Sequence, residues 1–498
     1  MPGDTERGRS PDQKHTHSRQ SSVWSIDLDI PKRTLLRRWS TKQWIAAFFA
    51  LLFGTGLLSH MFLTRGYWPG AVEEETADMA LPTGQTVVAH PVVLDKPRHH
   101  SAVLGSPTLQ FRDNLRNDTR YMTSWLSAGF TNDVMTLGNL IYLARITNRV
   151  PVLPPLDSFI GKRPIAKPFS EIFDLPRLER ALGMDVIEWK DVKDPKSEEL
   201  DVLGCWNVFQ VASMQATEPR FSRNAMFLKL DLSYTKAPPS VKLIPGFEHD
   251  SHSSFWSLAP LAFPDMRSKA LQSMTVETAP SPWTSTSTLP DEQMLCFDYL
   301  FYICSDVPFE YDNDIYPSWQ VVQKHFRWNA QVERVGQEYL RKLLNVAPGA
   351  PIPPHITIHA RHGDFKDWCS SPDLQVCFAS MHTFSRRVAE VQYELRQRRG
   401  ISVRPEHVIV TSDEESEAWW DEVKAMGWLR IDHEKERTVE RFGEWYPVIV
   451  DAYVQSAGLG FVGTDRSTFS TLARLRVRDW NDGAVRMVKW GKPDADEH

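Results

Sequence analysis

The chain has 498 residues, of which 24% are charged and 42% are hydrophobic, and its formal net charge is -6. A chain of this length is expected to form two or three domains, and its hydrophobic content is sufficient for packed cores. With this slightly acidic balance, the chain lacks the global basic field that would indicate a nucleic-acid-binding protein. No nucleic-acid partner is therefore expected.

An apolar segment lies close to the N-terminus. Residues 44–63 contain no Asp, Glu, Lys or Arg, and twenty helical residues span about 30 Å, the thickness of a bilayer's hydrocarbon core. Basic residues crowd the N-terminal side of this segment, whereas an acidic run at 73–75 follows it. The positive-inside rule therefore predicts a transmembrane signal-anchor that leaves a polar, disordered tail, residues 1–43, in the cytosol.

The residues after the predicted anchor are expected in the lumen of the Golgi or the endoplasmic reticulum. Residues 64–105 are rich in Pro, Gly, Thr and acidic residues, which predicts a stem. A short tail, an anchor, a stem and a large lumenal region are typical of single-pass type II glycosyltransferases, although other type II proteins share this layout. Asn117 begins an acceptor sequence for N-glycosylation that ends at Thr119.

Five cysteines follow the predicted anchor. Cys369 and Cys377 are eight residues apart, Cys296 and Cys304 have the same spacing, and Cys205 is left over. In an oxidising lumen, the simple expectation is two local disulfides, Cys369–Cys377 and Cys296–Cys304, and one free thiol. Spacing does not determine connectivity, so other pairings stay open.

The region after the stem divides into two halves, of which the first is residues 106–345. Apolar residues at helical spacing predict a helix over 132–147, and a strand at 150–153 follows and ends in two prolines. The stretch 235–293 is rich in Ser, Thr and Pro, which predicts an irregular insertion. A further helix is predicted over 328–344.

The second half, residues 346–498, alternates between strand and helix patterns. Strands are predicted at 355–360, 407–411 and 460–463, and helices at 380–399, 415–426 and 471–476. Such alternation predicts a parallel sheet, so the expected fold class is α/β with two similar halves. In such sheets, ligands bind beyond the carboxyl ends of the strands.

Polar residues follow the first strand of the second half, in the run His359-Ala-Arg361-His-Gly363-Asp364. Arg361 falls where the strand ends, and a guanidinium fork there can bind phosphate oxygens and neutralise a diphosphate leaving group. Gly363 permits a tight turn, and Asp364 could orient Arg361 or bind a base or a ribose. The alternative is an ordinary turn with a solvated arginine.

Polar groups also follow the other two predicted strands. The second strand ends in Thr411-Ser-Asp413, and the third is followed by a run, 464–470, that leads into a helix. Ser467, Thr468 and the first backbone amides of that helix could form an anion site. The alternative for both groups is plain capping of a helix, which needs no ligand.

These segments carry a resemblance to the GDP-fucose protein O-fucosyltransferases, and in particular to fungal-type, type II membrane members. Four segments resemble motifs of that family, in the same order: Gly129-Phe-Thr-Asn132, His359-x-Arg361-x-Gly363-Asp364, Val408 to Asp413, and Phe461 to Ser470. Together they extend over most of the predicted lumenal region.

The resemblance implies a GT-B-like fold, in which two Rossmann-like domains face each other, and an inverting transfer of fucose or a related sugar. The donor would be a GDP-sugar, the acceptor a hydroxyl of a protein or glycan, and no metal or other cofactor would be needed. Arg361 would bind the β-phosphate and assist the departure of GDP, and Asn132 would lie near the reacting sugar. The donor-binding residues would be His359, Asp364, Asp413, Ser467, Thr468 and Phe469.

The chain also departs from the family's pattern. Thr131 stands where the family usually has Gly or Asn, and the loop before it lacks the acid that some members offer as a base, so that Asp133 is the nearest candidate. These departures leave open a non-catalytic carbohydrate-binding or scaffold protein of the same fold. A metal-dependent UDP-sugar transferase would need an acidic pair, for which Asp312 and Asp314 are the candidates.

Overall fold

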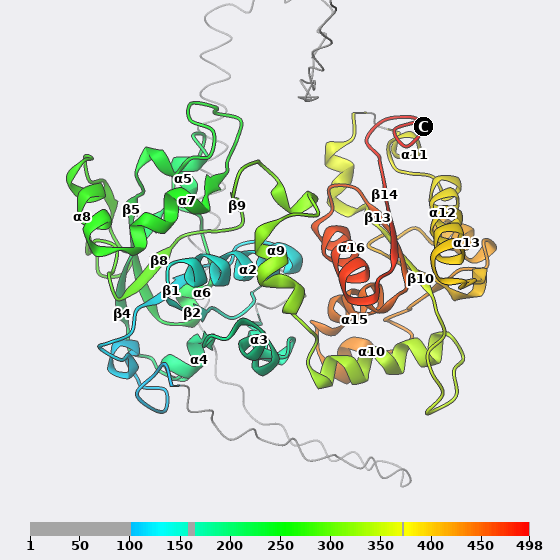
Figure 1. Ribbon diagram of the computed structural model, residues 1–498, viewed down its shortest axis with the longest axis horizontal. Helices are drawn as coiled ribbons and strands as arrows, with labels where there is room; N and C mark the ends of the chain where they lie inside the picture. The colour runs from blue at the N-terminus through cyan, green and yellow to red at the C-terminus, as the bar shows by residue number, and fades with distance from the viewer. Residues whose placement is uncertain (1–100, 158–164, 371–372, 498) are drawn as a thin grey trace, which may run out of the picture. The chain divides into compact units, whose positions relative to one another are not determined.

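The computed structural model describes residues 101–157, 165–370 and 373–497. These residues form two α/β lobes, each built on its own sheet, and Figure 1 shows the first lobe from blue to green and the second from yellow to red. The predicted tail and anchor lie outside the described residues, as does nearly all of the predicted stem. Among the residues that are described, no helix is both long enough and apolar enough to cross a membrane.

The first lobe contains a seven-stranded sheet in the order β3-β2-β1-β8-β4-β5-β7. Neighbouring strands run parallel, except that β7 runs antiparallel to β5. The strands are β1 (Tyr121–Ser124), β2 (Val150–Leu153), β3 (Ile187–Glu188), β4 (Asp201–Asn207), β5 (Leu230–Lys236), β7 (Thr278–Ala279) and β8 (Met294–Phe297). The strand predicted at 150–153 is β2, and its bounds agree with the prediction.

The helix predicted over 132–147 is α2 (Phe130–Ile146), which begins two residues earlier and packs on β1 and β2. Most of its residues are buried, because strands cover one side and further helices cover the other. The other helices of this lobe are α3 (Leu175–Leu182), α4 (Trp189–Val192), α5 (Phe209–Ala212), α6 (Asn224–Phe227), α7 (Phe255–Leu258), α8 (Pro264–Gln272) and α9 (Pro317–Val321). The predicted insertion contains only short elements after β5, among them β6 (Ser253–Ser254), which pairs with β9 (Ile303–Cys304).

The second lobe contains a five-stranded parallel sheet in the order β12-β11-β10-β13-β14. Its strands are β10 (Ile356–Ala360), β11 (Val408–Ser412), β12 (Leu429–Arg430), β13 (Gly460–Thr464) and β14 (Ala484–Val488). The three strands predicted from the sequence are β11, β10 and β13, and they are adjacent. Branched apolar residues fill their middle positions, where they are buried from both faces.

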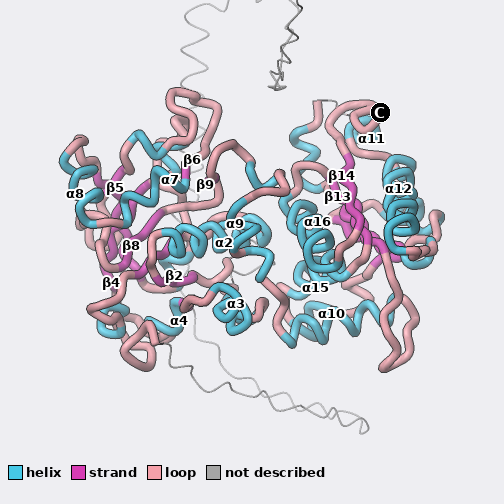
Figure 2. Tube along the Cα trace, viewed as in Figure 1, coloured by secondary structure: helices cyan, strands magenta, loops and turns pink. Residues whose placement is uncertain are grey.

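Helices cover both faces of this second sheet, as Figure 2 shows with the strands in magenta between cyan helices. The helices are α10 (Ala330–Leu343), α11 (Leu374–Cys377), α12 (Met381–Arg399), α13 (Glu417–Ala425), α14 (Thr438–Phe442), α15 (Tyr446–Ala457) and α16 (Thr468–Asn481). Capping sets the ends of α12: the Ser380 side chain accepts a hydrogen bond from the Thr383 amide, and Gly400 ends the helix at φ +64°. The helix expected from residue 471 begins three residues earlier, as α16, and continues further.

The cysteine pairing differs from the simple expectation. Cys369 is bonded to Cys377 as expected, but Cys296 is bonded to Cys205, and Cys304 is the buried free thiol. The expected Cys296–Cys304 disulfide is therefore wrong. Cys205 lies in β4 and Cys296 in the adjacent β8, so strand pairing brings them to a Cα separation of 4.5 Å across 91 residues of sequence.

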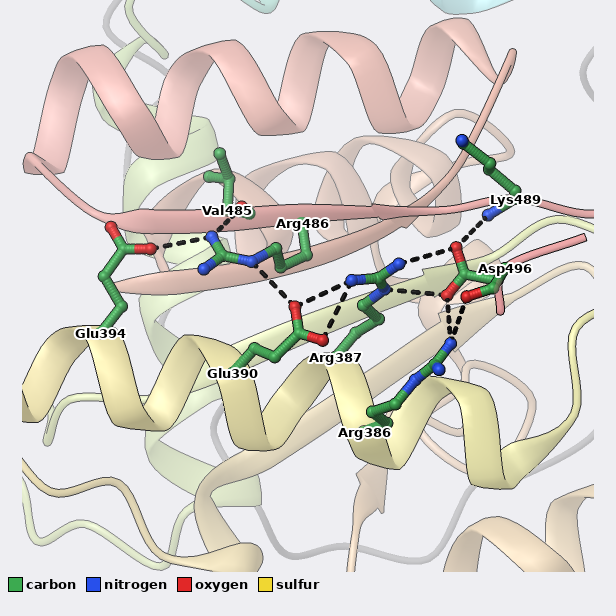
Figure 3. A network of polar contacts seen from close by, with 8 residues as sticks. All are labelled: Arg386, Arg387, Glu390, Glu394, Val485, Arg486, Lys489 and Asp496. Carbon is green, nitrogen blue, oxygen red and sulfur yellow. Dashed lines mark hydrogen bonds and ion pairs between the residues drawn. The ribbon is translucent and has the colours of Figure 1, made fainter. Parts of the chain in front are cut away.

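The C-terminal segment is fixed to α12 by an ion-pair network, which Figure 3 shows. The carboxylate of Asp496 is buried and accepts hydrogen bonds from the side chains of Arg386 and Arg387 and from the backbone amide of Lys489. Arg486 of β14 pairs in turn with Glu390 and Glu394 of α12. The network thus fixes the last residues of the chain to the face of the second lobe that α12 covers.

Candidate functional site

The carboxyl ends of β10 and β13 are connected by hydrogen bonds of two hydroxyl groups. Oγ1 of Thr464 accepts a hydrogen bond from the Arg361 amide at 2.9 Å and donates one to the His359 carbonyl at 3.0 Å. Oγ of Ser470 accepts one from the Thr464 amide at 3.0 Å. The two strands therefore hold His359 and Arg361 at one edge of the sheet, as the sequence predicts.

His359 is a neutral hydrogen-bonding group in this site. Burial, together with smaller electrostatic effects of Arg361 and His362, lowers its pKa to about 3. Its Nδ1 lies 2.7 Å from Oγ of Ser470. That hydroxyl also accepts the Thr464 amide, so Ser470 connects the His359 ring to the end of β13.

Arg361 lies between two carboxylates. One terminal nitrogen lies 2.5 Å from Asp413, and the other lies 2.5 Å from Asp364. The side chain of Asp364 is 67% exposed, whereas that of Asp413 is 29% exposed. Asp413 also accepts a hydrogen bond from the His362 amide at 2.8 Å, so it fixes both the guanidinium and the turn that follows β10.

This turn requires a glycine at position 363. A Cβ atom there would lie 2.1 Å from an oxygen of Asp413, and the residue has φ +22°. A side chain would therefore displace the carboxylate that holds Arg361. The sequence predicted a tight turn at Gly363, and the structure adds the close approach of Asp413 as the physical reason.

A second polar contact beside the site, between a histidine and a carboxylate, was not predicted from the sequence. His362 Nδ1 lies 2.6 Å from a carboxylate oxygen of Glu414, and the His362 ring stacks on Phe378 at 4.3 Å between centroids. Burial alone would raise the pKa of Glu414, but hydrogen bonds from the Ser416 amide and from His362 lower it overall. The position of His362 and Glu414 directly beyond two strands was the signal available in the sequence.

The starts of two long helices meet at this edge, one from each lobe. Ser467 caps α16, and the next residue, Thr468, donates a hydrogen bond to Oδ1 of Asn132 at 2.5 Å. Thr131, which precedes Asn132 in the first turn of α2, lies 2.8 Å from the same Thr468 hydroxyl. Asn132 and Thr468 are therefore together, as the resemblance implies, although 336 residues separate them.

This arrangement suits an anionic ligand. The N-terminus of a helix carries partial positive charge and unpaired amides, and here α2 and α16 both begin at the site. Arg361 follows β10, the strand next to the one that leads into α16, and supplies a full charge. The ring of Phe469 lies 5.0 Å from that of His359. The eight residues implied for donor binding and catalysis are therefore linked by direct contacts, by the shared Thr464 hydroxyl or by adjacent positions in the chain.

The acidic residues considered as a catalytic base or as a metal-binding pair make contacts with other groups of the protein. Asp133 is buried, and its carboxylate accepts a hydrogen bond from the Ala128 amide. Asp312 accepts one from Thr471 at 3.4 Å, and Asp314 pairs with Arg474 at 2.9 Å. In the described part of the chain, no three His, Cys, Asp or Glu side chains are grouped so that they could hold a metal ion.

Two further features lie away from this site. Asn117 is exposed in a turn before β1, where a glycan could be attached. A cavity of about 270 Å³ lies in the first lobe, and its wall includes Leu153, Trp189 and Phe227. The described residues that line the cavity include none of the residues predicted to bind the donor, so the candidate site is defined by its polar groups and not by this cavity.

The comparison with protein families decides the class of protein. A model of the GDP-fucose protein O-fucosyltransferases matches residues 121–478. The chain belongs to this family. As an O-fucosyltransferase family member it is a glycosyltransferase, and the matched residues include every strand of both main sheets except β14.

Solved structures of fucosyltransferases are similar to this family member. POFUT1 in complex with GDP-fucose shares 16% identity over 76% of this chain and 99% of its own, with a TM-score of 0.45. POFUT1 in complex with GDP shares 15% over 74% and 98%, with a TM-score of 0.46. The fucosyltransferase NodZ from Bradyrhizobium shares 14% over 72% and 94%, with a TM-score of 0.35. No curated protein sequence matches the chain.

Proposed function

We propose that this glycosyltransferase transfers fucose from GDP-fucose to a hydroxyl group of a protein or glycan, with inversion at the anomeric carbon. The observation that carries the proposal is the position of Arg361 beside the start of α16, where Thr468 meets Asn132 from the other lobe. A family match over residues 121–478 supports the same donor class.

In this reaction, the acceptor oxygen bonds to the anomeric carbon while the bond from that carbon to the β-phosphate oxygen breaks. The electron pair leaves with GDP, and the acceptor's proton passes to a base. Negative charge therefore grows on the β-phosphate, where Arg361 and the first amides of α16 would stabilise it. Asn132 would lie on the sugar side, because it comes from the opposite lobe.

The two carboxylates on Arg361 would behave differently when a diphosphate binds. An exposed ion pair contributes about 0–1 kcal/mol, so the mostly exposed Asp364 can release the guanidinium at small cost. Asp413 is less exposed and also holds the His362 amide, so it would stay and orient Arg361. His359, Ser467 and Phe469 would complete the donor site, with the neutral His359 ring as a hydrogen-bonding group.

The remaining parts of the proposal rest on the sequence. A signal-anchor at 44–63 would place the enzyme in the Golgi or endoplasmic reticulum membrane as a single-pass type II protein. The transfer would need no metal or other cofactor, since Arg361 and the helix amides would take the role of a cation on the diphosphate. Asn117 would carry a glycan.

Nucleotide binding by the full chain in detergent tests this function. Thermal unfolding, followed by tryptophan fluorescence, would be measured with GDP, UDP and GDP-fucose, each with and without a chelator. A ligand at 100 times its dissociation constant adds about 2.7 kcal/mol to the unfolding free energy. We expect GDP to stabilise the wild type in the presence of chelator, and Arg361→Ala to remove most of that shift. Arg398→Ala, which removes an exposed arginine of α12, is the control.

The other outcomes favour the alternatives. Stabilisation by UDP with manganese alone would favour a metal-dependent enzyme and direct attention to Asp312 and Asp314. A folded chain that binds no nucleotide would support a non-catalytic carbohydrate-binding or scaffold protein. If GDP-fucose binds, release of GDP on addition of candidate glycoprotein acceptors measures the transfer itself.

A further inference from the structure

The contact between the two helix starts has a defined hydrogen-bond direction. The Thr468 hydroxyl has one proton, and that proton is directed to Oδ1 of Asn132, an atom that can only accept. At 2.8 Å from Thr131, the Thr468 oxygen must therefore accept the proton of the Thr131 hydroxyl. The three groups form a chain in which Thr131 donates to Thr468 and Thr468 donates to Asn132.

This chain sets the orientation of the Asn132 carboxamide. With Oδ1 engaged by Thr468, the Nδ2 group is directed elsewhere, and no residue in the described part of the chain accepts a hydrogen bond from it. Thr131 is 5% exposed, and its hydroxyl lies within hydrogen-bonding distance of Thr468. Without the Thr131 hydroxyl, the Thr468 proton and the carboxamide would be free to rearrange.

The free Nδ2 group is placed to meet a particular part of the donor. Arg361 and α16 belong to the second lobe and take the diphosphate, whereas Asn132 belongs to the first lobe and approaches from the other side. We propose that Thr131 is a positioning residue that, through Thr468, directs Nδ2 of Asn132 to an oxygen atom of the transferred sugar. This inference rests on the proposed function and assigns a role to the residue that departs from the family's pattern.

Calorimetric titration of the full chain with GDP and with GDP-fucose distinguishes an effect on binding of the sugar from an effect on binding of the nucleotide. Thr131→Val keeps the shape of the side chain but removes its proton donor, and Thr131→Ser keeps the donor. A net hydrogen bond contributes about 0.5–1.5 kcal/mol, so we expect Thr131→Val to weaken GDP-fucose binding about 3- to 10-fold. The affinity for GDP should change by less than about twofold, and Thr131→Ser should bind both ligands like the wild type.

A double-mutant cycle identifies the residue through which Thr131 acts. In the background of Asn132→Ala, the change Thr131→Val should have no further effect on GDP-fucose binding. If Thr131→Val does not fold, Thr131→Ala replaces it, because that variant also lacks the donor and adds no bulk.

Three results would overturn the inference. Equal GDP-fucose affinity of Thr131→Val and the wild type would exclude a role for the hydroxyl. Equal losses in Thr131→Val and Thr131→Ser would exclude the proton donor as the cause, because Thr131→Ser keeps that donor. An equal loss for GDP and GDP-fucose would place the effect on the diphosphate. A wild type that binds neither nucleotide would instead defeat the proposed function, and the inference with it, so the two failures are distinguishable.

Discussion

The guanidinium of Arg361 lies 2.5 Å from the carboxylate of Asp413, the residue directly after β11. The same carboxylate accepts the amide of His362, and its position is the reason that residue 363 has no side chain. One acidic residue directly beyond the neighbouring strand thus determines where Arg361, the cation of the candidate donor site, is held.

Arg361→Lys should weaken GDP binding about tenfold, although the positive charge is kept. The guanidinium contacts Asp413 and Asp364 through different nitrogens, and a lysine ammonium offers a single point of contact in place of this planar fork. Calorimetric titration with GDP measures the change. Arg398→Lys is the matched control, because Arg398 also bridges two carboxylates, Glu394 and Asp482, on an exposed part of α12. Equal GDP affinities for all three proteins would exclude bidentate recognition by Arg361.

Gly363→Ala should lower the affinity for GDP, in addition to the loss of unfolding free energy that any alanine at a positive φ causes. Its Cβ would meet an oxygen of Asp413 at 2.1 Å, so the carboxylate must move and release Arg361. Gly349→Ala is the control, because Gly349 also has a positive φ, +80°, but nothing lies within 4 Å of its Cβ. Both variants should lose about 1–3 kcal/mol of unfolding free energy to backbone strain. Only Gly363→Ala should lose GDP affinity, and wild-type affinity in that variant would contradict the proposed arrangement.

The denatured, non-reduced chain should react with one equivalent of a maleimide, at Cys304. Peptide mapping should recover a linked pair from Cys205 and Cys296 and another from Cys369 and Cys377. Cys304→Ser should abolish the labelling. Its loss of unfolding free energy should be small, because the change replaces one buried atom and opens no disulfide. Cys205→Ser should cost about 2–5 kcal/mol, because it opens a long loop in the unfolded chain. Recovery of a peptide that links Cys296 to Cys304 would contradict this pairing.

Asp496→Asn should destabilise the chain at neutral pH by about 2–4 kcal/mol, because it leaves two arginines of α12 without their buried partner. Burial alone would raise the pKa of Asp496, but hydrogen bonds from Arg387 and the Lys489 amide lower it overall. A carboxyl with a lowered folded pKa contributes stability above its unfolded pKa of about 3.9, and this contribution is lost as the pH falls through the folded pKa.

The difference in unfolding free energy between the wild type and Asp496→Asn should therefore be constant from about pH 7 to pH 5 and shrink below about pH 4. Urea unfolding at a series of pH values measures it. Glu497→Gln, at the exposed neighbouring position, should show no such difference. If the difference in unfolding free energy between the wild type and Asp496→Asn grew as the pH falls, it would contradict the assigned role of Asp496.

Much of the second lobe could be predicted from the sequence alone. The predicted strands at 355–360, 407–411 and 460–463 agree with β10, β11 and β13 to within one residue, and the helix over 380–399 is α12 with its serine cap. These features depend on residue periodicity and on capping within a few residues, which the local sequence contains. The positions of Arg361, Asp413 and Thr468 beyond strand ends follow from the same pattern.

Only the tertiary structure decided which of these residues meet. Local spacing favoured a Cys296–Cys304 bond, but the order of strands in the first sheet places Cys205 beside Cys296. In the sequence, Thr131 is only a departure from the family's motif. In the structure, it lies at the start of α2 and contacts Thr468 of the other lobe. Periodicity and capping are set by neighbours in the chain, whereas strand order and the packing of two lobes bring together residues separated by 91 and 337 positions, a proximity that no local pattern records.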